Sequence, residues 1–299
     1  MAGSTCRTFS GSWTNPFTTG NDETGTRYMI IDPAESSSSA LNTNNHRDTS
    51  SITFDTTADL WTAGTSWIAD LEYATSGNKG STAQQDTFQT QLNASTTRTY
   101  QSRGGKITLH ASTTVNGSAA DAPPVKMFVL GEAIPNSEIT TRLNGLYSGA
   151  TPGLLTGIAY KESTYYQFFP TATLYGKQGR WPYESYDGGS HIGLMMVPIT
   201  FDRAWDWYVN TTDGAAVFQD KLATASRLET SIRNANPGLR ALTPTELENM
   251  ALVLYGPFAA AGNTNQYYIA AGSPVDWIIN TANNQNGVDY ADFIRSHIQ

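Results

Sequence analysis

The chain has 299 residues, of which 39% are hydrophobic, 11% aromatic and 15% charged, and its formal net charge is −8. This acidic balance excludes a nucleic-acid partner, which would need a basic face, and the aromatic content is too high for a disordered chain. No run approaches the roughly 20 apolar residues of a membrane span, so no membrane insertion is expected, and the length favours two domains.

Cysteine usage and the opening segment give expectations about the cellular compartment. The single cysteine, Cys6, cannot form an internal disulfide, so the fold does not depend on oxidation. The first residues, MAGSTCRTFSGSW, lack a basic stretch followed by an apolar one, which predicts synthesis in the cytoplasm without a signal peptide. Scattered histidines and the absence of a phosphate-binding glycine motif predict neither a metal site nor a cofactor.

Residues 1–131 are predicted to form a β domain. Short β-prone runs alternate with clusters of Gly, Ser, Asn and Asp, and they lie at 28–31, 51–54, 66–69, 106–110 and 125–129. Regularly spaced short strands with turn signals are typical of a β-sandwich. Residues 131–135 are expected to be the hinge to the second half.

Residues 132–299 are predicted to be mostly α-helical. Helix starts are expected at Ser137, Thr151-Pro152, Asp213, Thr243-Pro244 and Ser273-Pro274, and a last helix holds Val288, Tyr290, Phe293 and Ile294. The sequence Thr243-Pro244-Thr245-Glu246 has the form of a capping box. Strands followed by helices predict an α+β multidomain protein, with an all-β, sandwich-like domain over 1–131 and an α-dominated domain over 132–299.

Glu162 is the candidate catalytic residue of the helical half. Leu155, Ile158 and Ala159 are spaced as one buried helix face, Glu162 falls on that same face, and Tyr165 continues it. A carboxyl group among apolar side chains has its charged form disfavoured, so its pKa rises, as a general acid requires. A glutamate near a helix end also commonly reaches solvent or pairs with a basic side chain, and periodicity leaves both interpretations open.

Four motifs occur in order within residues 137–299. They are Glu162-Ser163 at the end of the apolar helix, GLMMVP at 193–198, AWDWYVN at 204–210 before a helix, and ALVLYG at 251–256. Together they resemble the lysozyme-like superfamily, in its goose-type lysozyme and soluble lytic transglycosylase branch, with its Glu-Ser, Gly-Leu-Met-Gln and Ala-Tyr-Asn-Ala-Gly motifs. Met196 and Gly256 depart from that pattern, since they stand where the family has glutamine and asparagine.

The resemblance implies a peptidoglycan muramidase that cuts between N-acetylmuramic acid and N-acetylglucosamine, with a lysozyme-like fold for the helical domain. It implies that Glu162 is the catalytic acid, that Tyr255 faces it, and that Asp187 corresponds to the aspartate that positions water in goose-type enzymes. The residues expected to contact the glycan are Ser163, Tyr165, His191, Gly193, Leu194, Met195, Met196 and Tyr255.

Two reactions remain open for this residue set. If Asp187 holds a water on the opposite sugar face, the reaction is inverting hydrolysis, and the two carboxylates should lie roughly 6.5–9.5 Å apart. Without a second carboxylate, Glu162 would become a base and take the proton of the sugar's own 6-hydroxyl, which gives a 1,6-anhydro product. Asp187 is equally well interpreted as a turn residue of an Asp-Gly-Gly loop.

The expected biological role is that of a cell-wall-degrading effector delivered by a phage or a bacterial secretion system. Peptidoglycan glycan strands would be its substrate in the periplasm or on the wall of a target bacterium, and an immunity protein or a delivery carrier its protein partner. The alternative is a non-catalytic wall-binding or phage-structural module whose lysozyme-like half has decayed, and Met196 and Gly256 keep it open. Aromatic residues in the 170–190 segment, Trp181, Tyr183 and Tyr186, are further candidates for stacking on sugars, and Glu184 is a weaker carboxylate candidate.

Overall fold

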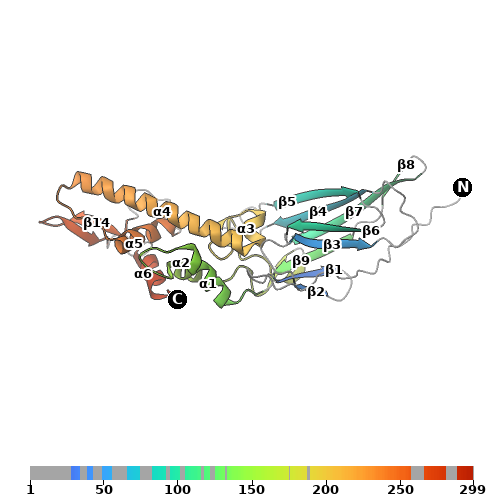
Figure 1. Cartoon of the computed structure of the whole chain (residues 1–299), viewed down its shortest axis with the longest axis horizontal. Helices are drawn as coiled ribbons and strands as arrows, with labels where there is room; N and C mark the ends of the chain where they lie inside the picture. Colours follow the sequence, from blue (N-terminus) through green and yellow to red (C-terminus); the bar gives the residue numbers. More distant parts are fainter. Residues whose placement is uncertain are drawn as a thin grey trace. The chain divides into compact units, whose positions relative to one another are not determined.

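The computed structural model describes residues 130–131, 133–174, 176–186, 189–256, 266–280 and 288–298, apart from the side chain of Lys177. Of the chain before residue 130 it describes the strands and their backbone pairing. The chain divides into two compact units (Figure 1). The first comprises residues 1–133, 168–190 and 200–206, and the second comprises residues 134–167, 191–199 and 207–299.

The first unit contains an antiparallel sheet. Seven strands pair in the order β2-β1-β9-β7-β4-β5, with β8 paired to β7, while β3 and β6 form a separate pair. The bounds are β1 (Tyr28–Pro33), β2 (Ser39–Asn42), β3 (Thr49–Asp55), β4 (Ser66–Ala74), β5 (Ala83–Gln91), β6 (Ser95–Gln101), β7 (Gly105–Val115), β8 (Ser118–Asp121) and β9 (Val125–Gly131). Apart from the end of β9 at residues 130–131, their side chains, and with them the predicted sandwich core, lie outside the described residues.

An aromatic cluster forms the core of the described part of the first unit. The ring of Trp205 lies 5.7 Å from that of Phe168 and 6.1 Å from that of Trp181, between centroids. Trp205 ends the short helix α3 (Phe201–Trp205), which begins after Thr200 because that hydroxyl accepts a hydrogen bond from the Arg203 N–H. A small hairpin, β10 (Ala172–Leu174) and β11 (Lys177–Gly179), belongs to the same unit.

The second unit is a mixture of helices and small antiparallel strands. Its helices are α1 (Asn136–Leu146), α2 (Leu154–Ser163), α4 (Trp207–Ala235), α5 (Pro244–Tyr255) and α6 (Asp289–Ser296). Two hairpins complete it: β12 (His191–Ile192) with β13 (Val197–Pro198), and β14 (Tyr268–Ala271) with β15 (Asp276–Ile279). The predicted helical character of this region is thus confirmed in its main elements, and the hairpins add strands to it.

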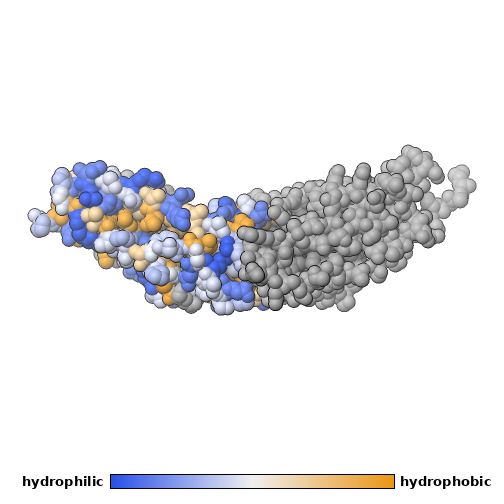
Figure 2. All heavy atoms as spheres, viewed as in Figure 1, coloured by the Kyte–Doolittle hydropathy of each residue, from blue (hydrophilic) through white to orange (hydrophobic). Residues whose placement is uncertain are grey.

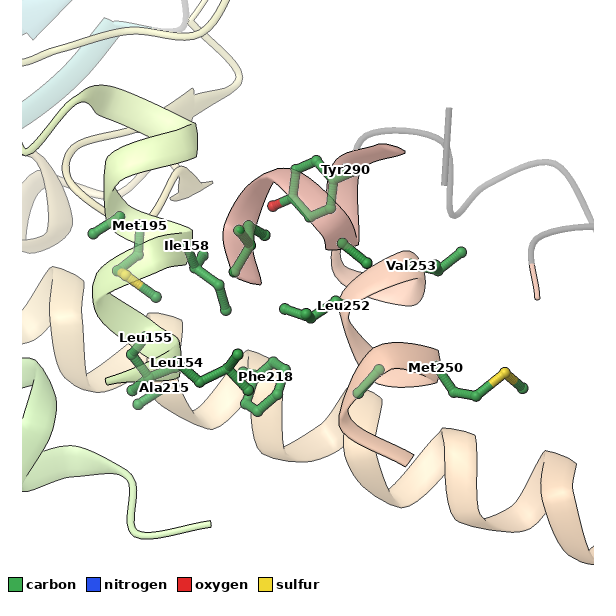
Figure 3. Packing of buried hydrophobic residues seen from close by; sticks show 14 of the residues in the cluster. Leu154, Leu155, Ile158, Met195, Ala215, Phe218, Met250, Leu252, Val253 and Tyr290 are labelled. Atoms are coloured by element: carbon green, nitrogen blue, oxygen red, sulfur yellow. The ribbon is translucent and has the colours of Figure 1, made fainter. Parts of the chain in front are cut away.

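One hydrophobic core joins the helices of the second unit (Figure 3). Ile158 of α2, Phe218 of α4 and Leu252 of α5 are each 0% exposed. Gly157 lets α2 and α6 approach closely, because an added Cβ would lie 2.6 Å from the Ile294 carbonyl oxygen. Full burial of each large apolar side chain contributes roughly 1.5–3 kcal/mol, so Leu154, Leu155 and Ile158 together anchor α2 in this core.

The face of the described residues seen in Figure 2 mixes hydrophilic residues with apolar ones. Exposed apolar side chains in the described residues include those of Val275, Ile278 and Ile279 in the β14–β15 hairpin, which are 44–46% exposed. In the described helices, no segment is long and apolar enough to cross a bilayer.

Helix α2 starts and ends differently from the prediction. It begins at Leu154 after Gly153, which adopts a left-handed φ of 76°, so Thr151 is not its N-cap. The Thr151 hydroxyl instead donates to Glu248 Oε2 at 2.5 Å, because this tertiary acceptor takes the place of a capping contact. The helix ends at Ser163, and Tyr165 has a left-handed φ of 63°, so the predicted stripe does not continue through it as helix.

Two further helix predictions need correction. The long helix α4 begins at Trp207 rather than at Asp213, because the buried side chains of Trp207 and Asn210 already pack in its first turn. The helix predicted at Ser273-Pro274 is wrong: these residues lie in the turn between β14 and β15. β15 pairs antiparallel with β14, with Ala271 opposite Asp276 and Tyr268 opposite Ile279, so the residues after Pro274 form a strand rather than a helix.

The capping box that opens α5 is confirmed. The Thr243 side chain accepts a hydrogen bond from the Glu246 N–H at 3.3 Å, and the Thr243 N–H donates to Glu246 Oε2 at 2.7 Å. Pro244 follows at the first helical position, where a missing N–H costs nothing.

Candidate functional site

Glu162 lies in the last turn of α2, at the edge of the helical core. Its side chain is mostly buried but keeps some access to solvent. Burial raises the pKa of the Glu162 carboxyl above its ordinary value, and the Tyr290 hydrogen bond and the charges of Lys161 and His191 offset part of that rise. The predicted environment of Glu162 is therefore present: a carboxyl group whose protonated form is favoured by desolvation.

Tyr290 is the direct partner of Glu162. Its hydroxyl donates a hydrogen bond to Glu162 Oε1, and in Figure 3 this hydroxyl points toward α2. Tyr290 is 6% exposed, and its burial together with the nearby charge of Glu162 raises its pKa well above the ordinary value. The phenol consequently stays protonated and remains a donor at neutral pH.

Tyr290 was missed as a site residue in the sequence, where it appeared only as part of the apolar face of the last helix. A signal was nevertheless available. A hydroxyl on a buried helix face needs a partner, which is the same conflict that singled out Glu162. The sequence offered no means of choosing that partner.

Tyr255, at the end of α5, also lies close to Glu162 but bonds elsewhere. Its hydroxyl donates to the Met195 carbonyl oxygen at 2.7 Å. Burial, followed by the charge of Glu162, raises the pKa of Tyr255 well above its ordinary value. The charge of Glu162 thus acts on Tyr255, as expected for two nearby residues, but the hydrogen bond to the Glu162 carboxylate comes from Tyr290.

The residues Gly193, Leu194, Met195 and Met196 form the tight turn between β12 and β13, called here the 193–196 turn. The side chains of Leu194 and Met195 are 0% exposed and belong to the helical core, whereas Met196 is partly exposed. Gly193 has φ 76° and Met196 φ 44°, both left-handed. Within the turn only Met196 is partly exposed, while Gly193, Leu194 and Met195 are buried, and contact of the turn with a glycan remains a prediction.

Two other expected glycan contacts lie inside the second unit. Ser163 is 1% exposed, and its hydroxyl lies 3.0 Å from the carbonyl oxygens of both Ala159 and Leu194. Tyr165 is 4% exposed, with its ring 5.5 Å from that of Tyr160. In this arrangement Ser163 connects the end of α2 to the 193–196 turn.

His191 is the remaining expected residue of the second unit, and it lies on β12, partly exposed, where its charge acts on Glu162. Asp187 lies outside the described residues, so its predicted role stays a prediction. Of the aromatic candidates in the first unit, Trp181 is 2% exposed within the aromatic cluster, so it offers no free face to a sugar. The ring of Tyr183 packs on that of Phe169, with 4.6 Å between the ring centroids, and Tyr186 is fully exposed.

The chemistry available at Glu162 is proton transfer. Because Tyr290 holds Oε1, a proton on Oε2 can be donated while the charge that develops on the carboxylate remains hydrogen-bonded. Within the described ranges, no group of three or more His, Cys, Asp or Glu side chains is arranged to hold a metal ion. Comparisons with protein-family models, with curated proteins and with solved structures find no match to this chain.

Proposed function

We propose that this chain is a peptidoglycan muramidase, related to the lysozyme-like superfamily, in which Glu162 is the general acid. The observation that supports this proposal is the environment of Glu162: a mostly buried carboxyl group with a raised pKa and one oxygen held by the Tyr290 hydroxyl. A carboxyl group whose protonated form is favoured by burial and that is still reachable from solvent can protonate a glycosidic oxygen.

In the proposed reaction, Glu162 transfers the proton on Oε2 to the oxygen that links N-acetylmuramic acid to N-acetylglucosamine. The bond to that oxygen breaks, and the sugar carbon develops oxocarbenium character. Tyr290 donates to Oε1 in both protonation states, so it stabilises the carboxylate as the proton leaves. The bound phenol thus offsets part of the desolvation that raises the pKa.

The second half of the reaction has two forms. With Asp187 holding a water, Asp187 takes one proton of that water as its oxygen adds to the sugar carbon, and a reducing end is produced. With Glu162 acting as the base, it removes the proton from the sugar's 6-hydroxyl, whose oxygen closes the 1,6-anhydro ring. In the anhydro form Glu162 regains its proton from the 6-hydroxyl. In the hydrolytic form Glu162 regains a proton from bulk solvent, and Asp187 releases the proton of the water to bulk solvent.

The delivery and partners belong to the same proposal. The protein would be carried by a phage or a bacterial secretion system and would act on glycan strands in the periplasm or on the wall of a target bacterium. An immunity protein or a delivery carrier would be its protein partner. The motif order along residues 137–299 supports the relationship to wall-degrading enzymes.

The test is digestion of purified peptidoglycan by the wild type and by Glu162→Gln, with released muropeptides identified by mass spectrometry. Glu229→Gln is a matched control, because Glu229 is a buried carboxylate on α4 that bonds Arg233 rather than Tyr290. Reducing-end or anhydro disaccharide products from the wild type and the control, and none from Glu162→Gln, would support the proposal and choose between its two forms. Release of peptides alone, or equal activity of Glu162→Gln, would contradict it. Wall binding by a folded wild type without products would favour the non-catalytic alternative.

A further inference from the structure

The backbone of the 193–196 turn and its flanks is held by side chains from several elements of the second unit. The Leu194 N–H donates to Gln167 Oε1 at 3.2 Å, and the Met195 N–H donates to Asn210 Oδ1 at 2.9 Å. Asn210 also donates from Nδ2 to the Ile192 carbonyl at 2.8 Å. The two carboxamides thus satisfy three backbone groups of one hairpin.

These carboxamides are buried and lie directly against the turn. Asn210 is 0% exposed and Gln167 is 2% exposed. A Cβ added at Gly193 would lie 2.3 Å from Asn210 Nδ2 and 2.6 Å from Gln167 Oε1. At such distances the two side chains leave room for glycine alone, so the turn and the carboxamides form one close-packed arrangement.

The same turn makes two contacts that lead to Glu162. The Leu194 carbonyl accepts from Ser163, the residue next to Glu162 on α2. The Met195 carbonyl accepts from Tyr255, whose pKa is raised in part by the charge of Glu162. Displacement of the turn would therefore disturb both the end of α2 and the tyrosine beside the carboxyl group.

We propose that Asn210 and Gln167 are positioning residues for Glu162, which act by holding the 193–196 turn against Ser163 and Tyr255. Both are buried, and their carboxamides bond backbone groups of the hairpin, which fits them to hold a wall of the site. The effect on catalysis rests on the proposed muramidase function, whereas the effect on the turn and on the Glu162 carboxyl does not.

The experiment uses the full chain with Asn210→Leu and Gln167→Met, which keep much of the side-chain volume and remove the polar atoms. Hydrogen exchange in the absence of substrate measures how firmly the backbone of the 193–196 turn is held. The Met195 amide should exchange about tenfold faster in Asn210→Leu, and the Leu194 amide about tenfold faster in Gln167→Met. The NMR titration of the Glu162 carboxyl should move toward its ordinary pKa in both variants, because a loosened wall admits water.

Asn280→Leu is the matched control, because Asn280 is also buried and donates from Nδ2 to a backbone carbonyl, that of Gln266. It should leave the two amides and the titration of Glu162 unchanged. If Asn210→Leu does not fold, the Leu194 amide exchange and the Glu162 titration of Gln167→Met decide the question, since this variant removes the acceptor of the Leu194 N–H.

Unchanged titration of Glu162 in a folded variant whose turn amides exchange faster would overturn the positioning role. On peptidoglycan, the expected loss is in kcat with KM within about twofold, and a loss confined to KM would instead make the turn a binding element. A wild type without activity on peptidoglycan would remove the proposed function, and the exchange and titration results would still decide the positioning role.

Discussion

Replacement of Gly193 by alanine tests how tightly the 193–196 turn is held beside Glu162. Two costs add in Gly193→Ala. The left-handed φ of 76° costs a residue with a Cβ roughly 1–2 kcal/mol. The new methyl group would also overlap the buried carboxamides, 2.3 Å from Asn210 and 2.6 Å from Gln167, and overpacking of this kind costs about 1–3 kcal/mol. The expected loss of unfolding free energy is therefore about 2–5 kcal/mol.

Gly238→Ala provides the matched control within the same unit. Gly238 also has a positive φ, of 98°, but nothing lies within 4 Å of the position of an added Cβ. Its loss should therefore be limited to the conformational cost, roughly 1–2 kcal/mol. The measurement is urea unfolding followed by hydrogen exchange of the second unit's helices, so that the first unit does not contribute to the transition.

The loss of unfolding free energy in Gly193→Ala is compared with that in Gly238→Ala. If Gly193→Ala loses no more stability than Gly238→Ala, the turn has room to move, and the close packing against the two carboxamides is refuted. If the expected difference appears, Gly193→Ala combined with Gln167→Ala should lose less than the sum of the two single losses, because the smaller side chain leaves room for the methyl group.

The other predictions concern the Glu162 site and the α5 cap. Glu162→Gln should abolish muropeptide release and raise the unfolding free energy at pH 7. Because the pKa of Glu162 is raised in the folded state, the stability of the wild type falls as pH rises above 4.5. Denaturation at pH 4 and pH 7 should therefore show the gain in stability of Glu162→Gln only at pH 7. Tyr290→Phe removes a hydrogen bond that lowers this pKa, so the alkaline limb of the pH–rate profile should move to higher pH, with kcat reduced about tenfold or more. Thr243→Ala should cost about 1 kcal/mol by thermal unfolding. The Arg240 hydrogen bond holds the pKa of Glu246 at about 2, so the contribution of Glu246 is present above pH 4.5 and should be lost toward pH 2 in acid titrations.

Local signals predicted the elements that depend on neighbouring residues. The α5 start is encoded by Thr243 and Glu246, which are three positions apart and close a capping box by themselves. The apolar stripe of Leu155, Ile158 and Ala159 likewise placed Glu162 beside a buried surface, because helical periodicity alone decides which side chains share a face. These features follow from contacts within one or two turns of chain.

Local signals failed where a distant residue competed for the same group. Thr151 has the residue type and the following proline of a helix cap, but its hydroxyl bonds Glu248, 97 positions away. Ser273-Pro274 has a helix-start pattern, but pairing between β14 and β15 places it in a hairpin turn. In both cases the local preference is small, and tertiary contacts outweigh it.

The sequence by itself determined the acidic, cysteine-poor character of the chain, the main helices of its second half and the position of Glu162 on a buried helix face. Tertiary structure alone decided what surrounds that carboxyl. The bond from Tyr290 joins residues 128 positions apart, and the turn beside the site is held by side chains from separate elements. Periodicity acts over a few residues, whereas these partners meet only when the shared core brings α2, α4, α5 and α6 together.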